Sequence, residues 1–173
     1  MVYQCGLRLS EAIRIKPKHI DGERLVIRIV DGKGSKSREV PITPELYQRL
    51  RIFWNAHRNP DWLFPGVGRG WKQKGYSLRE ALGAHPKPMS KSGVWAAFNL
   101  AKAECGLDKK HEILRVHTLR HSYATHMLEG GASVRQVAAY LGHSSLKPVM
   151  VYLHLTEISE EKARVALSTL ASS

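Results

Sequence analysis

The sequence predicts a single domain of the α+β class, mostly helical, with a small antiparallel β-sheet or hairpin. Most of the chain divides into segments that begin near Ser or Thr and end at Gly or Pro, as helices do. Only residues 25–41 combine β-branched runs with a central turn. With 173 residues, the chain is long enough for one domain to bury a substantial core.

The first half is expected to contain short elements around a hairpin. Residues 1–5 are typical of the last turn of a helix, which Gly6 closes. The elements expected next are a short helix from Ser10 to Ile15 that Pro17 ends, strands over 25–30 and 37–41 joined by turn residues 31–36, and a helix from Pro44 to about Ala56 capped by Thr43. The hairpin carries Lys33 at its tip.

The second half is expected to be helical after a long loop. Residues 60–90 are rich in Gly, Pro and basic side chains, which predicts a loop with one helical turn near 78–81. Ser90 or Ser92 caps a helix to about Cys105, which Gly106 terminates. The remaining helices are expected over residues 118–129, 133–141, 145–155 and 159–170.

The charge balance favours a polyanionic partner. Lys and Arg number 27 against 15 Asp and Glu, a formal net charge of +12. Nucleic acid is favoured over a membrane surface, because the basic residues are spread through loops rather than set opposite a clean apolar face. No apolar run is long enough for a membrane span, and no signal-peptide pattern is present. Two cysteines indicate no disulfide framework, so a cytoplasmic location is expected.

Five polar residues point to a single chemical task. Arg8 follows a helix-ending glycine, His117 and Arg120 are three residues apart, and His143 and Tyr152 are nine apart. Two guanidinium groups can grip the non-bridging oxygens of one phosphate. A tyrosine hydroxyl can attack phosphorus, and histidines can move or hold protons around it. The set suits attack on a phosphodiester without a metal.

Simpler interpretations exist for each residue taken alone. An arginine after a helix end is usually solvated, and a tyrosine in an apolar helix usually belongs to the core. A zinc site at His117 and His121 is disfavoured, because the glutamate of the His-Glu-x-x-His motif is missing and Arg120 between them repels a cation. His121 and His126 are interpreted as structural residues.

The ordered set closely resembles the tyrosine recombinases, the phage-integrase-like family that includes Xer and integron integrases. The resemblance covers essentially the whole chain and implies the catalytic domain of such an enzyme, without cofactor or metal. It implies that Arg8 and Arg120 clamp the scissile phosphate. It further implies that Tyr152 attacks the phosphorus, forming a 3′-phosphotyrosyl link and a free 5′-hydroxyl.

The resemblance also assigns supporting roles. Lys33 corresponds to the hairpin lysine that protonates the leaving 5′ oxygen, with Lys36 and Arg38 as nearby competitors. His117 is the best candidate for proton traffic at Tyr152, and His143 is expected to hydrogen-bond the phosphate. Glu11, one helical turn from Arg8, is expected to hold that guanidinium in place; an ordinary first-turn glutamate is the alternative. Further contacts to DNA phosphates are expected from Lys36, Arg38 and Lys91.

The expected partner is double-stranded DNA, on which four protomers assemble. An amphipathic helix over 159–170 is the candidate that docks onto a neighbouring protomer; packing on its own domain is the alternative. Residues 1–173 are expected to form a catalytic domain shortened at its N-terminal side, without the N-terminal core-binding domain of the family. Two alternative functions stay open: a non-catalytic DNA-binding remnant, and a nicking topoisomerase that relaxes supercoils.

Overall fold

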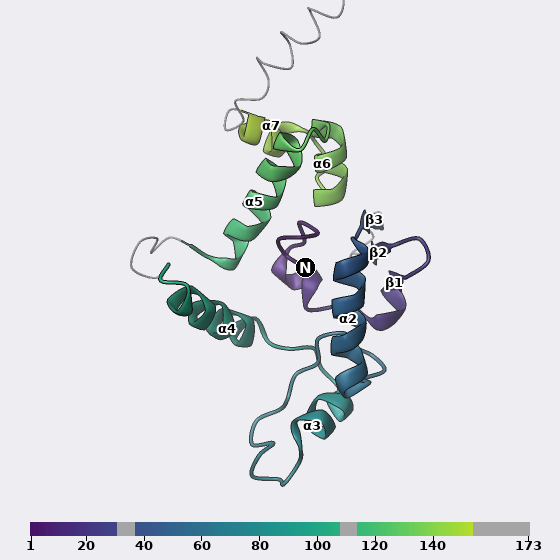
Figure 1. Ribbon diagram of the computed structural model, residues 1–173, viewed down its shortest axis with the longest axis vertical. Helices are drawn as coiled ribbons and strands as arrows, with labels where there is room; N and C mark the ends of the chain where they lie inside the picture. Colours follow the sequence, from purple (N-terminus) through teal and green to yellow (C-terminus); the bar gives the residue numbers. More distant parts are fainter. Residues whose placement is uncertain (31–36, 108–113, 154–173) are drawn as a thin grey trace, which may run out of the picture.

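The computed structural model describes residues 1–30, 37–107 and 114–153 (Figure 1). Its elements in chain order are α1 (Leu9–Ala12), the 3₁₀ helix η1 (Pro17–His19), β1 (Ile20–Asp21), β2 (Val26–Ile29), β3 (Arg38–Pro41), α2 (Pro44–His57), α3 (Leu78–Ala84), α4 (Lys91–Glu104), α5 (Val116–Glu129), α6 (Val134–Leu141) and α7 (Lys147–Leu153). The predicted α+β class, mostly helical with a small antiparallel sheet, is confirmed.

The sheet is antiparallel, with strand order β1-β2-β3. Ile27 of β2 pairs with Val40 of β3, and both side chains are fully buried. Arg28 and Glu39, one residue along, pair on the outer face. This alternation is that of a sheet with one face packed on a core. Strand β1 was not predicted, because two residues are too few to give a pattern.

Helix starts follow local capping chemistry. The side chains of Thr43, Ser90 and Ser133 accept hydrogen bonds from backbone N–H groups three residues on, at 3.1–3.2 Å. The predicted starts of α2 and α4 are therefore confirmed, with Ser90 rather than Ser92 as the cap of α4. Helix α6 begins at Val134, one residue after the predicted start. Helix α5 begins at Val116, two residues before the predicted start, and α7 begins at Lys147, two residues after it. Helix α3 extends the predicted turn at 78–81 to Ala84.

The described part of the chain has two separate apolar cores. The N-terminal core joins the segment around α1, the sheet and α2, and consists of Cys5, Leu7, Ala12, Ile15, Ile27, Ile29, Val40, Ile42, Leu46, Leu50 and Leu63. The C-terminal core joins α5, α6 and α7, and consists of Tyr123, Ala124, Leu128, Val137, Ala138, Leu141 and Val149. Figure 1 shows α5, α6 and α7 grouped at one end, with the N-terminal segment between them and α2.

A junction between the two cores is formed at Gly6. Its φ of +60° is a conformation that favours glycine. A Cβ atom at this position would lie 2.5 Å from Tyr123 and 2.8 Å from Leu141, so only a bare backbone fits against the C-terminal core. Strand β3 also contacts α6. The polar residues of the candidate site line this junction.

Helix α4 contributes to neither core. None of its residues is buried, and Trp95 and Leu100 are exposed. Among the helices that the structure describes, none is both long and apolar enough to cross a membrane.

Candidate active site

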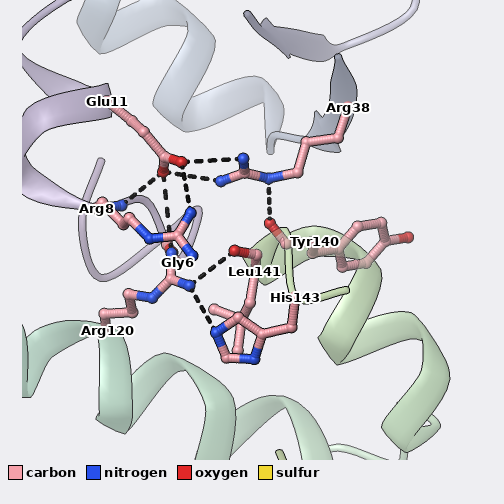
Figure 2. Close-up of polar contacts among 8 residues, drawn as sticks. All are labelled: Gly6, Arg8, Glu11, Arg38, Arg120, Tyr140, Leu141 and His143. Carbon is pink, nitrogen blue, oxygen red and sulfur yellow. Dashed lines mark hydrogen bonds and ion pairs between the residues drawn. The ribbon is translucent and has the colours of Figure 1, made fainter. Parts of the chain in front are cut away.

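Glu11 is the centre of the charged cluster at the junction (Figure 2). It occupies the third position of α1, and its carboxylate accepts the backbone N–H of Arg8 at 2.7 Å and the Arg8 side chain at 3.0 Å. The Glu11 side chain is only 10% exposed. Burial opposes its charge, but hydrogen bonds from Arg38 and Arg8 outweigh this and hold the pKa of the carboxyl below its usual range. Glu11 therefore stays ionised and orients Arg8.

Arg38 connects the hairpin to this cluster. Its two Nη atoms donate to the two carboxylate oxygens of Glu11 at 3.0 and 2.8 Å, a bidentate pair. Its Nε donates at 2.8 Å to the carbonyl oxygen of Tyr140 in α6. The side chain is 13% exposed, and a Cβ at Gly142 would lie 2.7 Å from its guanidinium. Arg38 thus joins β3 to the last turn of α6.

Arg120 is a buried arginine that makes the reciprocal connection. From α5, its Nη1 donates to the carbonyl oxygen of Gly6 at 2.6 Å. Its Nη2 donates to the carbonyl oxygen of Leu141 at 2.7 Å. Burial and the charge of Arg8 lower the pKa of Arg120 to about 10, still well above neutral pH. The structure thus places Arg120 among backbone carbonyls, which compensate its buried charge.

His143 follows the left-handed Gly142 that ends α6. Its Nε2 lies 3.1 Å from Nη2 of Arg120, and the imidazole accepts there because a guanidinium only donates. Burial, followed by the charges of Arg120, Arg8 and Arg38, lowers the pKa of His143 and favours the neutral ring. Its Nδ1 is buried and has no hydrogen-bond partner among the described residues.

Tyr152 lies on α7 and faces α5. Its ring packs against the C-terminal core, and its hydroxyl forms a hydrogen bond with Nδ1 of His121. The expected partner was His117, which lies one turn earlier, exposed, with its ring edge-on to His121 at 4.6 Å. Burial raises the pKa of Tyr152, while the charge of Arg120 partly offsets this.

The remaining predicted residues lie away from the cluster or outside the described residues. Lys33 and Lys36 belong to the segment that the structure does not describe. Lys91 is exposed at the first position of α4. The structure therefore brings together Arg8, Glu11, Arg38, Arg120 and His143. Next to Arg120 on α5, His121 contacts Tyr152 and His117 contacts His121.

Sequence reasoning missed one participant, His121. The signal that was available is its spacing of four residues from His117, which puts both rings on one face of α5. Nothing local could show that Tyr152, 31 residues away, ends on this ring.

The charge of the cluster suits a phosphate. Three guanidinium groups surround one carboxylate, since Nη1 of Arg120 also lies 3.9 Å from Glu11. The excess positive charge is fixed in place by hydrogen bonds before a ligand arrives. Arg8 keeps its side chain 41% exposed, which leaves its outer edge open to a substrate. Such a preorganised cationic site stabilises a phosphoryl transition state.

Known proteins have sequences similar to this one. A model described as the phage integrase family matches residues 1–158. The chain is 38% identical over 153 residues to the putative integrase/recombinase y4qK of Sinorhizobium fredii, covering 88% of this chain and 44% of that protein. It is 38% identical over 156 residues to tyrosine recombinase XerD of Corynebacterium glutamicum, covering 90% of this chain and 46% of that protein. The chain spans about half the length of the curated relatives it matches.

Solved structures share the fold. XerH site-specific recombinase, solved bound to difH substrate, has a TM-score of 0.68 at 23% identity, covering 94% of this chain and 43% of that chain. The catalytic domain of bacteriophage HP1 integrase has a TM-score of 0.57 at 21% identity, covering 94% of this chain and 75% of that chain. The expected fold of a recombinase catalytic domain is confirmed.

Proposed function

Because this chain belongs to the phage integrase family of tyrosine recombinases, we propose that it cleaves and rejoins double-stranded DNA in site-specific recombination. The observation that carries the proposal is the gathering of two arginines and a tyrosine, distant in sequence, at one junction. DNA as substrate is supported by the structural neighbours, since XerH was solved with difH substrate and Tn1549 integrase with transposon end DNA.

Arg8 and Arg120 bind the scissile phosphate in this proposal. Their charges neutralise the oxygens as the phosphorus becomes pentacovalent. His143, whose Nε2 lies 3.1 Å from Nη2 of Arg120, donates a hydrogen bond to a phosphate oxygen when its ring proton is on Nε2. Glu11 and Arg38 keep the guanidinium groups of Arg8 and Arg120 in position. The burial of Arg38 and its two ties to Glu11 support a positioning role, beside the phosphate contact expected for it.

Tyr152 is the nucleophile. Its oxygen bonds to phosphorus, the bond from phosphorus to the 5′ oxygen breaks, and Lys33 donates the proton that the leaving oxygen takes up. The 5′-hydroxyl of a partner strand then attacks the phosphotyrosine and reverses the step. Because the link conserves the phosphoester, the cycle needs neither a nucleotide nor a metal.

DNA binding and assembly extend beyond the described site. We include Lys36 and Lys91 as phosphate contacts, and a homotetramer on DNA in which residues 159–170 dock onto a neighbour. Lys36 and that segment lie outside the described residues, so these parts of the proposal follow from the sequence resemblance.

The nucleophile is tested by trapping the covalent link. The protein is mixed with a pool of nicked duplexes of randomised sequence, and adducts that survive denaturing electrophoresis are collected and sequenced. Tyr152→Phe should abolish adducts while DNA binding stays nearly unchanged, since only one hydroxyl is removed. Tyr47→Phe, on α2, is the matched control and should retain them. Adducts from Tyr152→Phe would disprove the assignment, whereas binding without adducts from the wild-type chain would identify a non-catalytic remnant.

The acid is tested with a modified leaving group. Lys33→Ala should slow cleavage of ordinary DNA, and a bridging sulfur at the 5′ position should restore the rate, because a thiolate leaves without a proton. Lys36→Ala should show no such rescue. If sulfur rescues Lys36→Ala instead, the acid role passes to Lys36.

A further inference from the structure

The contact between α5 and α7 places an imidazole on the nucleophile. The hydroxyl of Tyr152 is hydrogen-bonded to Nδ1 of His121, and the two rings lie 5.6 Å apart at 49°. The tyrosine ring is held by the C-terminal core, so the direction of its hydroxyl is set by packing. His121 is exposed on its outer side, where a proton can exchange with water.

His117 occupies a different place from the one that its sequence position suggested. Its ring lies edge-on to His121, with centroids 4.6 Å apart and planes at 89°. Among the described hydrogen bonds of Tyr152, the partner is His121. His117 thus contacts the ring of His121 and makes no hydrogen bond with the phenol among those described.

We propose that His121 is the group that takes the phenolic proton when Tyr152 attacks the phosphate. This inference rests on the function proposed above and assigns a catalytic residue to the same site. As the bond from the tyrosine oxygen to phosphorus forms, the O–H bond breaks and the proton moves to Nδ1, giving an imidazolium. Lys33 protonates the leaving 5′ oxygen independently. In the rejoining step the proton returns from Nδ1 to the departing phenolate, so the cycle is balanced.

The surroundings support this role for His121. Burial, followed by the charges of His117 and Arg120, lowers the pKa of His121, so the ring is neutral and able to accept at pH 7. Burial raises the pKa of Tyr152, so the phenol keeps its proton until an acceptor removes it. His117 and Arg120 on α5 and Tyr152 on α7 are the titratable groups that face His121 in the described part of the chain.

The test compares pH profiles of adduct formation, using nicked duplexes recovered from the randomised pool. The wild-type rate should rise with pH through the pKa of His121 and then level off, because only the neutral ring accepts a proton. His121→Asn keeps an acceptor atom near the position of Nδ1 but not a base. It should lose about 100-fold in rate at neutral pH, together with the inflection, and approach the wild type as hydroxide replaces the base. His121→Phe should behave likewise.

Controls separate the possible failures. If His121→Asn retains the wild-type rate and inflection while Tyr152→Phe forms no adduct, the assignment of His121 is wrong and the proposed function stands. If His117→Asn rather than His121→Asn removes the inflection, the proton acceptor is His117. Adducts from Tyr152→Phe would overturn the proposed function itself.

A second measurement needs no DNA. The imidazole nitrogens of His121 are followed by NMR through a pH titration of the full chain and of Tyr152→Phe. If the phenol donates to Nδ1, the neutral ring is stabilised, and removing the hydroxyl should raise the pKa of His121. Nδ1 should also be unprotonated in the neutral ring. A proton found on Nδ1, or a pKa that falls in the variant, would overturn the proposal.

Discussion

The two cores bring different chemistry to the site where they meet. The side of the N-terminal core supplies charged side chains, Arg8, Glu11 and Arg38, tied to one another by ion pairs. The side of the C-terminal core supplies imidazoles, a phenol and the carbonyl groups at the end of α6, which accept from arginines. One arginine from each side donates to the backbone of the other: Arg38 to Tyr140, and Arg120 to Gly6. The hydrogen bonds that fix Arg120, one of the two arginines proposed to bind the phosphate, therefore also join the two sides of the junction.

The two clamping arginines offer the sharpest test of this difference. Replacing either by Met should slow adduct formation by about 10²- to 10³-fold, because each removes a preorganised cation from the transition state. Only Arg120→Met should also destabilise the fold, by about 3 kcal/mol, since it leaves buried carbonyls unpaired. Urea unfolding of the two variants measures this. Equal losses of stability would mean that Arg120 has no special part in joining the cores.

Gly6 tests the junction without touching a charge. Gly6→Ala should destabilise the protein by about 3 kcal/mol, through a strained positive φ and a clash with Tyr123. Gly75→Ala is the matched control: its φ is +74°, but a Cβ there meets nothing within 4 Å. It should carry the strain alone, about 1 kcal/mol. Thermal melting of both variants decides the point; similar melting temperatures would refute close packing at Gly6.

Two carboxylates that each accept hydrogen bonds from two arginines complete the comparison. Glu11 is buried at the junction, whereas Glu39 pairs with Arg24 and Arg28 on the exposed face of the sheet. At neutral pH, Glu11→Gln should destabilise by about 3 kcal/mol, because it leaves arginines without their counter-charge. Glu39→Gln should change stability too little to resolve, since water screens exposed pairs.

The contribution of Glu11 to stability depends on pH with a definite sign. The pKa of Glu11 in the folded state lies below its usual value of 4.5, so its contribution is present above that value and is lost as the pH falls through the folded pKa. When the free energy of unfolding is measured with urea at a series of pH values, its fall at acid pH should therefore be less steep in Glu11→Gln. An unchanged slope would show that other carboxyl groups govern acid unfolding.

Local signals predicted much of the fold. The hairpin strands, the caps at Thr43 and Ser90 and the glycine at position 6 follow from residue type and near neighbours. Arg8, Glu11, Arg120 and His143 were predicted as site residues and lie together, whereas Lys91 lies apart on α4. What escaped were contacts over long separations in sequence. Arg38 reaches a carbonyl 102 residues away and Arg120 one 114 residues away, and no local pattern encodes such distances.

His121 and the burial of Arg120 illustrate the same limit. On α5 alone, spacing identifies which side chains share a face, but not which face another helix will cover. Packing of α7 against α5 decides that His121, and not His117, meets Tyr152.

The double use of Arg120 has an evolutionary consequence. A gene copy released from selection for strand cleavage is still expected to keep this arginine, because its bonds to Gly6 and Leu141 join the two sides of the junction. The hydroxyl of Tyr152 is not needed for the fold in this way, since the ring packs against the C-terminal core without the hydroxyl. In a lineage that loses the reaction, we expect tyrosine to drift to phenylalanine while Arg120 persists. The presence of Tyr152, rather than that of Arg120, therefore indicates that a family member is still an active enzyme.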